Sequence, residues 1–274
     1  MRNCLQSTSK DRESLLALLF QSRLLFLYTS HLSVLSQGEQ IEFALLFSQI
    51  VHSSARTCLS SYMLQEDGLR ILRTVVQSYA SSTKGCSNGV LFRKCLHNAH
   101  LLQYYLEHPE IIYPLFSEYS HSQNTEIRRD VLLSIQDLLL GHPEYGELPY
   151  AQIALTGFPL LLNTPFVDAQ IEGLHILYNY LMLPTTATRL FLDSIPLISS
   201  VFALLQSQSV KVVVNAYYVM KQFIVAPSKK AMRLYLIANR NQIATLLLSI
   251  PCHESDTEFS HERERILNAL QKMK

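Results

Sequence analysis

Tryptophan is absent from this 274-residue chain, and glycine and proline are scarce, with eight and ten residues respectively. Ordinary proteins contain about 12% of glycine and proline together, which is well above the share found here. So few glycines disfavour cofactor-binding loops, collagen-like segments and turn-dense β-sandwiches, because these need many flexible or left-handed backbone positions. The composition therefore favours long helices with short connections.

Charged residues are also few, at 16% of the chain. Lys and Arg number 23 and Asp and Glu number 22, which gives a formal net charge of +1. Nucleic-acid binding requires a concentrated basic surface that neutralises phosphates, and this balance does not supply one. We therefore expect no nucleic-acid partner. The apolar content of 48% excludes a disordered chain.

Cysteine usage indicates the compartment. The five cysteines are odd in number and widely spaced, and no Asn-x-Ser/Thr sequon occurs in the chain. Disulfide frameworks of secreted proteins use even sets at regular spacing, so a reducing, cytoplasmic location is predicted, with all five thiols free. The cysteines are Cys4, Cys58, Cys86, Cys95 and Cys252.

The apolar stretch from Leu15 to Leu35 resembles a membrane anchor at first sight. Six polar residues interrupt it, whereas a membrane-spanning helix needs roughly 20 predominantly apolar residues. These residues are Gln21, Ser22, Arg23, Ser30, His31 and Ser33. We therefore predict a soluble helix and no membrane insertion.

An internal period appears in the second half. Helix pairs are expected to end before Pro143, Pro184 and Pro227, which are 41 and 43 residues apart. HEAT and armadillo repeats have a period of about 40 to 47 residues. The spacing predicts an all-α, armadillo/HEAT-like solenoid, a right-handed superhelix of helix pairs, and a single domain over residues 1–274.

Capping residues and apolar stripes support these helices. Asn124 or Thr125 is expected to cap the helix from Glu126, and Thr164 to cap a helix that begins at Pro165. Apolar residues recur at helical spacing on one side of the helix before Pro227, namely Val213, Ala216, Tyr217, Met220 and Ile224. A C-terminal helix carries the stripe Ile266, Leu270 and Met273. In the first half, helices are predicted near residues 12–28, 39–52, 66–80, 88–98 and 100–121.

Catalytic motifs are not found. The chain contains no phosphate-binding glycine loop, no GxSxG nucleophile elbow, no HExxH zinc motif and no EF-hand loop. Cys86, Cys95, His97 and His100 could supply zinc ligands, but their spacing matches no established zinc module, and Cys95 lies within an apolar helix. We expect a protein without catalytic residues, cofactor or metal, and a metal-dependent enzyme around Cys95 is the rival hypothesis.

Several segments match one family in order and spacing. The matching residues in the last repeat are Ala216, Tyr217, Val219, Lys221, Phe223 and Ile224. Upstream, the matching residues are Gly89, Arg93, Cys95, Asp137, Leu138, Leu139 and His142. The chain thereby resembles the calcium-binding protein 39 family, also called the Mo-twenty-five scaffolds, over about residues 20–274. Relative to the family, the chain is expected to lack some N-terminal helices.

The resemblance implies a non-enzymatic scaffold that is monomeric when alone. Its concave face would hold a protein kinase or pseudokinase of the sterile-twenty class and favour the active conformation. The family's concave-face positions fall on Val167, Ile171 and His175, or on Phe166 and Gln170 if the alignment shifts by one residue. These replace a more polar pattern, so apolar packing is expected there.

The resemblance also implies a C-terminal pocket for a hydrophobic tail peptide of the tryptophan-x-phenylalanine type. The family's pocket positions fall on Phe202, Arg240 and Ala244. Of the family's two pocket lysines, one is replaced by arginine and the other by alanine. The alternative is a generic HEAT or armadillo adaptor that binds another extended peptide and has no kinase partner.

Overall fold

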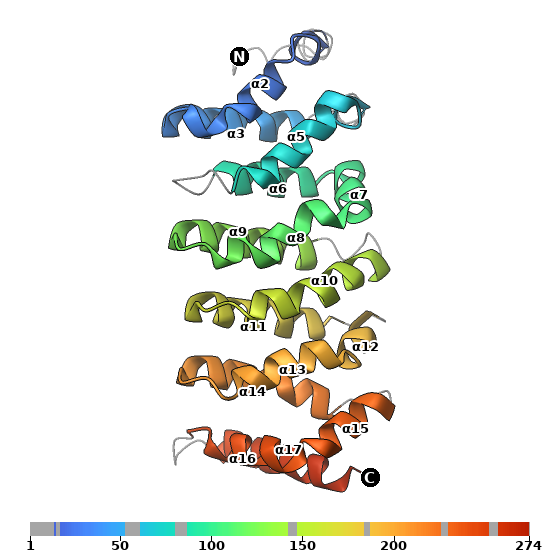
Figure 1. Cartoon of the computed structure of the whole chain (residues 1–274). Coiled ribbons are helices and arrows are strands. Elements are labelled where there is room, and N and C mark those ends of the chain that lie inside the picture. Colours follow the sequence, from blue (N-terminus) through green and yellow to red (C-terminus); the bar gives the residue numbers. More distant parts are fainter. Residues whose placement is uncertain are drawn as a thin grey trace. The chain divides into compact units, whose positions relative to one another are not determined.

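The computed structural model describes residues 14, 17–52, 61–79, 87–141, 147–183, 187–225, 230–251 and 257–273. Throughout these ranges the chain forms helices and connecting turns, and no strand occurs in them (Figure 1). The prediction of an all-α helical-repeat fold is confirmed.

The chain divides into two compact units, Met1–Tyr145 and Gly146–Lys274. The first contains α2 (Leu24–Ser30), η2 (Leu32–Val34), α3 (Gln37–His52), α5 (Glu66–Gln77), α6 (Ser87–Leu96), α7 (Ala99–Glu107), α8 (Pro109–Ser117), η3 (Tyr119–His121) and α9 (Thr125–Leu140). The second contains α10 (Glu147–Leu162), α11 (Val167–Leu181), α12 (Ala187–Leu192), α13 (Ile195–Leu204), α14 (Val210–Val225), α15 (Lys230–Ala238), α16 (Arg240–Ser249) and α17 (Thr257–Lys272).

Equivalent helices of successive repeats pack side by side within each unit (Figure 1). In the first unit α3 contacts α6, and α6 contacts α9; in the second, α11 contacts α14, and α14 contacts α17. The helices α9, α11 and α14 begin at Thr125, Val167 and Val210, which are 42 and 43 residues apart. The predicted repeat period is therefore confirmed, although Pro143, Pro184 and Pro227 themselves lie outside the described residues.

The helix α14 lies at the centre of the second unit. Four residues of its predicted apolar stripe are buried, and Val213 is half-buried. Other sides of the same helix are buried too, because α11, α13 and α17 all pack against it. Burying a large apolar side chain contributes about 1.5–3 kcal/mol. This helix is therefore held by its neighbours on several sides.

The two predicted caps behave differently. The side chain of Asn124 accepts hydrogen bonds from the N–H groups of Glu126 and Ile127, at 2.9 and 3.4 Å, so this cap is confirmed. The prediction for Thr164 is wrong, because α11 begins at Val167 and Phe166 is its N-cap. The Thr164 hydroxyl instead accepts a hydrogen bond from the N–H of Phe166 at 3.4 Å, which closes a turn. Pro165 lies in this turn, before the first residue of α11.

Two helices predicted in the first half are interrupted. The helix near residues 12–28 breaks at Arg23, whose φ of 55° is left-handed and incompatible with a continuous helix. The helix over residues 100–121 divides at His108, because Pro109 lacks a backbone donor and begins α8. In the C-terminal stripe, Ile266 and Leu270 are buried and Met273, which follows α17, is half-buried.

A buried polar network joins α6 to α9. The carboxylate of Asp130 accepts hydrogen bonds from Arg93 Nη2 at 2.8 Å and from the Tyr79 hydroxyl at 3.0 Å. Arg93 Nη1 also donates to the Ser134 hydroxyl at 2.7 Å. Burial, with a further contribution from the carboxylate, raises the pKa of Tyr79 well above its usual value, so the hydroxyl remains a donor. Gly89 touches this network: a Cβ atom there would collide with Asp130 and Tyr79.

We predict that Gly89→Ala lowers the free energy of unfolding by about 1–3 kcal/mol, because the added methyl group forces the network apart. Urea denaturation followed by circular dichroism measures this change. Gly38→Ala is the matched control, since nothing lies within 4 Å of a Cβ atom at that position. Equal stability of the two variants would show that the network accommodates the methyl group.

Candidate protein-interaction surfaces

Exposed apolar side chains cover one side of α11 and α14. The exposed fractions of Val167, the first residue of α11, and Met182, its C-cap, are 46% and 56%, and those of Val210 and Val225 on α14 are 55% and 62%. In each helix the two residues are 15 positions apart, which places them on the same side. We define the α11–α14 face as Val167, Ile171, Tyr178, Met182, Val210, Val214, Tyr218 and Val225.

The two halves of this face are continuous. The rings of Tyr178 and Tyr218 meet across the two helices, with centroids 6.4 Å apart and an interplanar angle of 70°. Such edge-to-face pairs are a favoured aromatic arrangement. Ile171, Tyr178 and Val214 are half-buried and lie at helical spacing between the more exposed residues of their helices. The result is an apolar surface that spans two neighbouring repeats.

The predicted concave-face residues all lie at the start or along α11. Val167 and Ile171 belong to the α11–α14 face, and His175 lies one turn further, exposed, with its Nδ1 3.8 Å from Glu172 Oε2. Phe166 and Gln170 are half-buried. The Gln170 amide donates to the carbonyl of Thr164 at 2.8 Å. The unshifted alignment therefore names the more accessible residues.

The predicted tail-pocket residues lie on two helices. Phe202, on α13, is buried with 9% of its surface exposed, while Arg240 begins α16 and Ala244 follows one turn later, half-buried. Arg240 Nη2 donates a hydrogen bond to the carbonyl of Met273, beyond α17. Its Nε is buried and makes no hydrogen bond. The cation is thus partly engaged with the chain itself.

The cysteine and histidine cluster does not form a metal site within the described residues. Cys95 is fully buried in α6, and burial raises the pKa of its thiol to about 12. Zinc binds the thiolate, which this environment disfavours. His97 and His100 are exposed, and Cys86 lies outside the described residues. No group of three potential ligands is brought together among the residues described.

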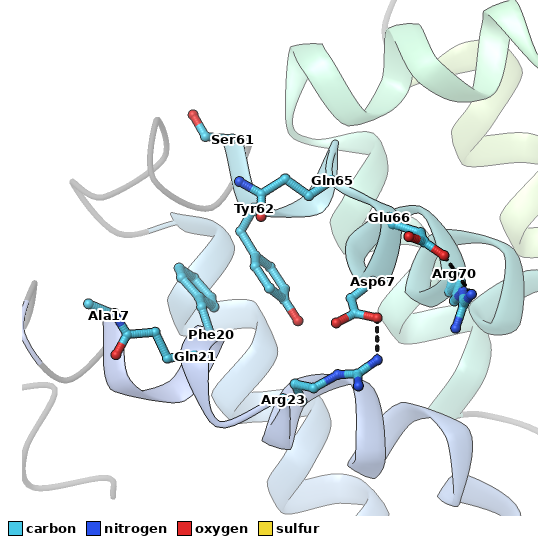
Figure 2. Close-up of a pocket in the computed structure, with 10 residues that line it drawn as sticks. All are labelled: Ala17, Phe20, Gln21, Arg23, Ser61, Tyr62, Gln65, Glu66, Asp67 and Arg70. Carbon is cyan, nitrogen blue, oxygen red and sulfur yellow. Dashed lines mark hydrogen bonds and ion pairs between the residues drawn. The ribbon is translucent and has the colours of Figure 1, made fainter.

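The sequence did not predict a pocket of about 870 Å³ beside the start of α5 (Figure 2). Phe20 stacks on Tyr62 with ring centroids 4.5 Å apart, and the Tyr62 hydroxyl, buried without a hydrogen-bond partner, points toward Arg23 and Asp67 (Figure 2). Arg23 Nη2 lies 2.6 Å from Asp67 Oδ1.

The charges of this pocket balance. A second ion pair joins Arg70 Nη2 to Glu66 Oε1 at 2.6 Å. Because each arginine in the lining already has a carboxylate partner, the pocket is not a prepared anion site. The i,i+4 spacing of Glu66 and Arg70 is visible in the sequence, whereas Arg23 and Asp67 are 44 residues apart and give no local signal.

Within the described ranges, every helix is too short or too polar to cross a lipid bilayer.

Stacked helix pairs with an exposed apolar face on equivalent helices define a helical-repeat protein. A family model described as Mo25-like matches residues 1–274. The chain belongs to this family of non-catalytic scaffolds, as the resemblance in sequence predicts. No curated protein matches the chain in sequence.

One solved structure supports a likeness in fold. An engineered protein with a crystal structure shares 14% identity, covers 90% of this chain and 96% of its own, and gives a TM-score of 0.51. An archaeal HEAT-like repeat protein from Thermococcus onnurineus NA1 shares 14% identity over 84% of this chain and 97% of its own, with a TM-score of 0.39. At this identity, the engineered protein supports the fold alone.

We predict that Cys95 resists alkylation by iodoacetamide at pH 8 in the folded protein, because its thiol is buried and protonated. Peptide mass mapping after brief labelling measures this. In urea without reductant, Cys95 and the other four cysteines should all react. Rapid labelling of Cys95 in the folded protein, or one zinc per chain by elemental analysis, would contradict the structural role.

Proposed function

We propose that this protein is a non-enzymatic scaffold that binds a sterile-twenty-class protein kinase or pseudokinase through the α11–α14 face and favours its active conformation. It does so as one armadillo-like domain over residues 1–274. Membership of the Mo25-like family supports the scaffold role. The observation that carries the binding site is the continuous exposed apolar surface over α11 and α14.

The chemistry of this face suits a protein partner. Soluble proteins rarely leave large contiguous apolar patches exposed unless the patch binds something. Tyrosine and methionine, which are enriched at the centres of interfaces, are both present as Tyr218 and Met182. The eight residues of the face include no charged side chain, and Lys221, which lies on α14 at the position that Tyr178 has on α11, is paired with Glu262. Binding should therefore depend on apolar packing, with weak dependence on ionic strength.

A second contact is proposed around α16, where the region of Phe202, Arg240 and Ala244 takes the hydrophobic tail peptide of the partner. Arg240 supports this, because it is half-buried at the start of α16 and its positive charge suits a carboxylate of the peptide. The aromatic anchors of such a peptide should dominate its affinity, since buried aromatic residues form most interface hot spots.

The alternative function is a generic helical-repeat adaptor without a kinase partner, which the same apolar face would serve. Affinity purification of the full chain followed by mass spectrometry separates the two. Recovery of a protein kinase or pseudokinase with the wild-type chain, and its loss with Val210→Asp, supports the proposed function. Recovery of other proteins alone, through the same residues, supports the adaptor.

We predict that Ile171→Asp and Val210→Asp each weaken binding of the recovered kinase about tenfold or more, because a buried carboxylate replaces apolar contact. Biolayer interferometry with the purified pair measures the change. Leu160→Asp is the matched control, because Leu160 is exposed on α10 and is not one of the eight residues of the face. A wild-type affinity that falls steeply with salt would show that a charged surface dominates instead.

We predict also that Phe202→Leu weakens a tail peptide ending in tryptophan-x-phenylalanine more than Arg240→Gln does. The reason is that apolar anchors outweigh a partly exposed ion pair, which contributes about 0.2–1 kcal/mol. Fluorescence anisotropy with a labelled peptide compares the variants, after thermal melts show that each is folded. Unchanged binding by Phe202→Leu would make Phe202 an ordinary core residue of α13.

A further inference from the structure

The pocket of about 870 Å³ beside the start of α5 lies within the first unit and belongs to neither surface proposed for the kinase or its tail (Figure 2). Its volume falls in the range of about 300–1,000 Å³ that is usual for ligand sites. One wall is aromatic, formed by the half-buried ring of Phe20 stacked on Tyr62, and another is the first turn of α5. A ligand of this pocket therefore need not be the kinase.

The hydroxyl of Tyr62 is a buried donor in this pocket. The residue is 8% exposed, and its hydroxyl has no hydrogen-bond partner among the described residues. Burial, with a further contribution from Asp67, raises the pKa of Tyr62, so the hydroxyl keeps its proton at neutral pH. Figure 2 shows it pointing toward Arg23 and Asp67. Because buried hydroxyls are normally hydrogen-bonded, this one indicates a ligand that brings an acceptor.

The first turn of α5 supplies further donors. Within the described part of the chain, no side chain caps this helix, whose N-cap is Gln65. The first N–H groups of a helix have no partner inside it. Gly68 lets this turn approach Tyr62, because a Cβ atom at position 68 would collide with the backbone of Tyr62 and Met63. The uncapped turn and the tyrosine are therefore held as close neighbours.

The carboxylates of this turn decide which acceptor fits. Glu66 and Asp67 lie in the first turn of α5, where their negative charge already complements the helix dipole. Each also pairs with an arginine, Arg70 and Arg23 respectively. A ligand carboxylate placed here would be repelled by both acidic side chains. A carboxamide instead offers a neutral oxygen as acceptor and an NH₂ group as donor, which suits a wall that has both donors and carboxylates.

We propose that this pocket binds a short segment of a partner protein in which an aromatic residue neighbours an asparagine or glutamine. The aromatic ring packs on Phe20. The carboxamide oxygen accepts from the Tyr62 hydroxyl and from the first turn of α5, and the carboxamide NH₂ donates to Asp67. Rotation of Arg23, whose side chain is 55% exposed, opens the hydroxyl to the ligand.

The test uses the full chain and a fluorescein-labelled ten-residue peptide with phenylalanine–asparagine at its centre, flanked by glycine and serine. Fluorescence anisotropy at near-physiological salt measures binding. Two control peptides replace the asparagine by aspartate or the phenylalanine by alanine. We expect both to bind at least tenfold more weakly, the first because Glu66 and Asp67 repel it and the second because the aromatic contact is lost.

The decisive variant is Tyr62→Phe, which removes the hydroxyl and keeps the ring. Its affinity for the phenylalanine–asparagine peptide should fall about three- to tenfold, the size expected for one hydrogen bond. Its melting temperature should not fall, because the hydroxyl has no partner within the described chain. Tyr104→Phe on α7 is the matched control and should bind as the wild type does. The Tyr104 hydroxyl is likewise buried without a partner among the described residues, but Tyr104 does not line the pocket.

A second variant, Phe20→Leu, tests the aromatic wall and should also weaken the peptide, with a melting curve to show that the fold is kept. Equal affinity of the wild type and Tyr62→Phe would overturn the proposal. So would a lower melting temperature of Tyr62→Phe, which would give the hydroxyl a structural role. A wild type that prefers the aspartate peptide, or that binds no peptide at millimolar concentration, would overturn it as well.

Discussion

Every long apolar helix in this protein needs neighbouring repeats to cover it. Isolated helices of this length are marginal in water, and most of their stability comes from packing. The helix α14 shows the constraint most clearly, because α11, α13 and α17 all pack against it and seven of its residues are buried. Where this covering stops, apolar surface remains, and the α11–α14 face lies at such a place.

Apolar stacking alone leaves neighbouring helices free to rotate or slide. The hydrogen bonds to Asp130 on α9, from Arg93 on α6 and from Tyr79 just after α5, remove part of that freedom in the first unit. Burying these charges costs desolvation free energy, which their mutual contacts offset. In the second unit, the ion pair between Lys221 and Glu262 joins α14 to α17 in a similar way.

The features that depend on nearby residues could be predicted from the sequence. The repeat period and the Asn124 cap were predicted because a few adjacent positions determine them. The break before Pro109 follows from the same kind of local rule, because proline begins a helix more readily than it continues one, but a single helix over residues 100–121 was predicted. The left-handed backbone at Arg23 could not be predicted in this way, because no neighbouring residue indicates it and its partner Asp67 is 44 residues away. The pocket beside the start of α5 joins residues from Ala17 to Arg70, so it depends on tertiary packing that the sequence does not show.

The contact between Gly89 and Asp130 has a consequence for how the sequence can change over time. A side chain at position 89 is tolerated only if the carboxylate at position 130 moves or is lost. Loss of the carboxylate would leave the guanidinium of Arg93 without its ion-pair partner. Substitutions at these three positions are therefore epistatic, and each has a different cost in each background. The three residues are therefore expected to change together during evolution, although they lie on two helices and are separated by up to 41 positions.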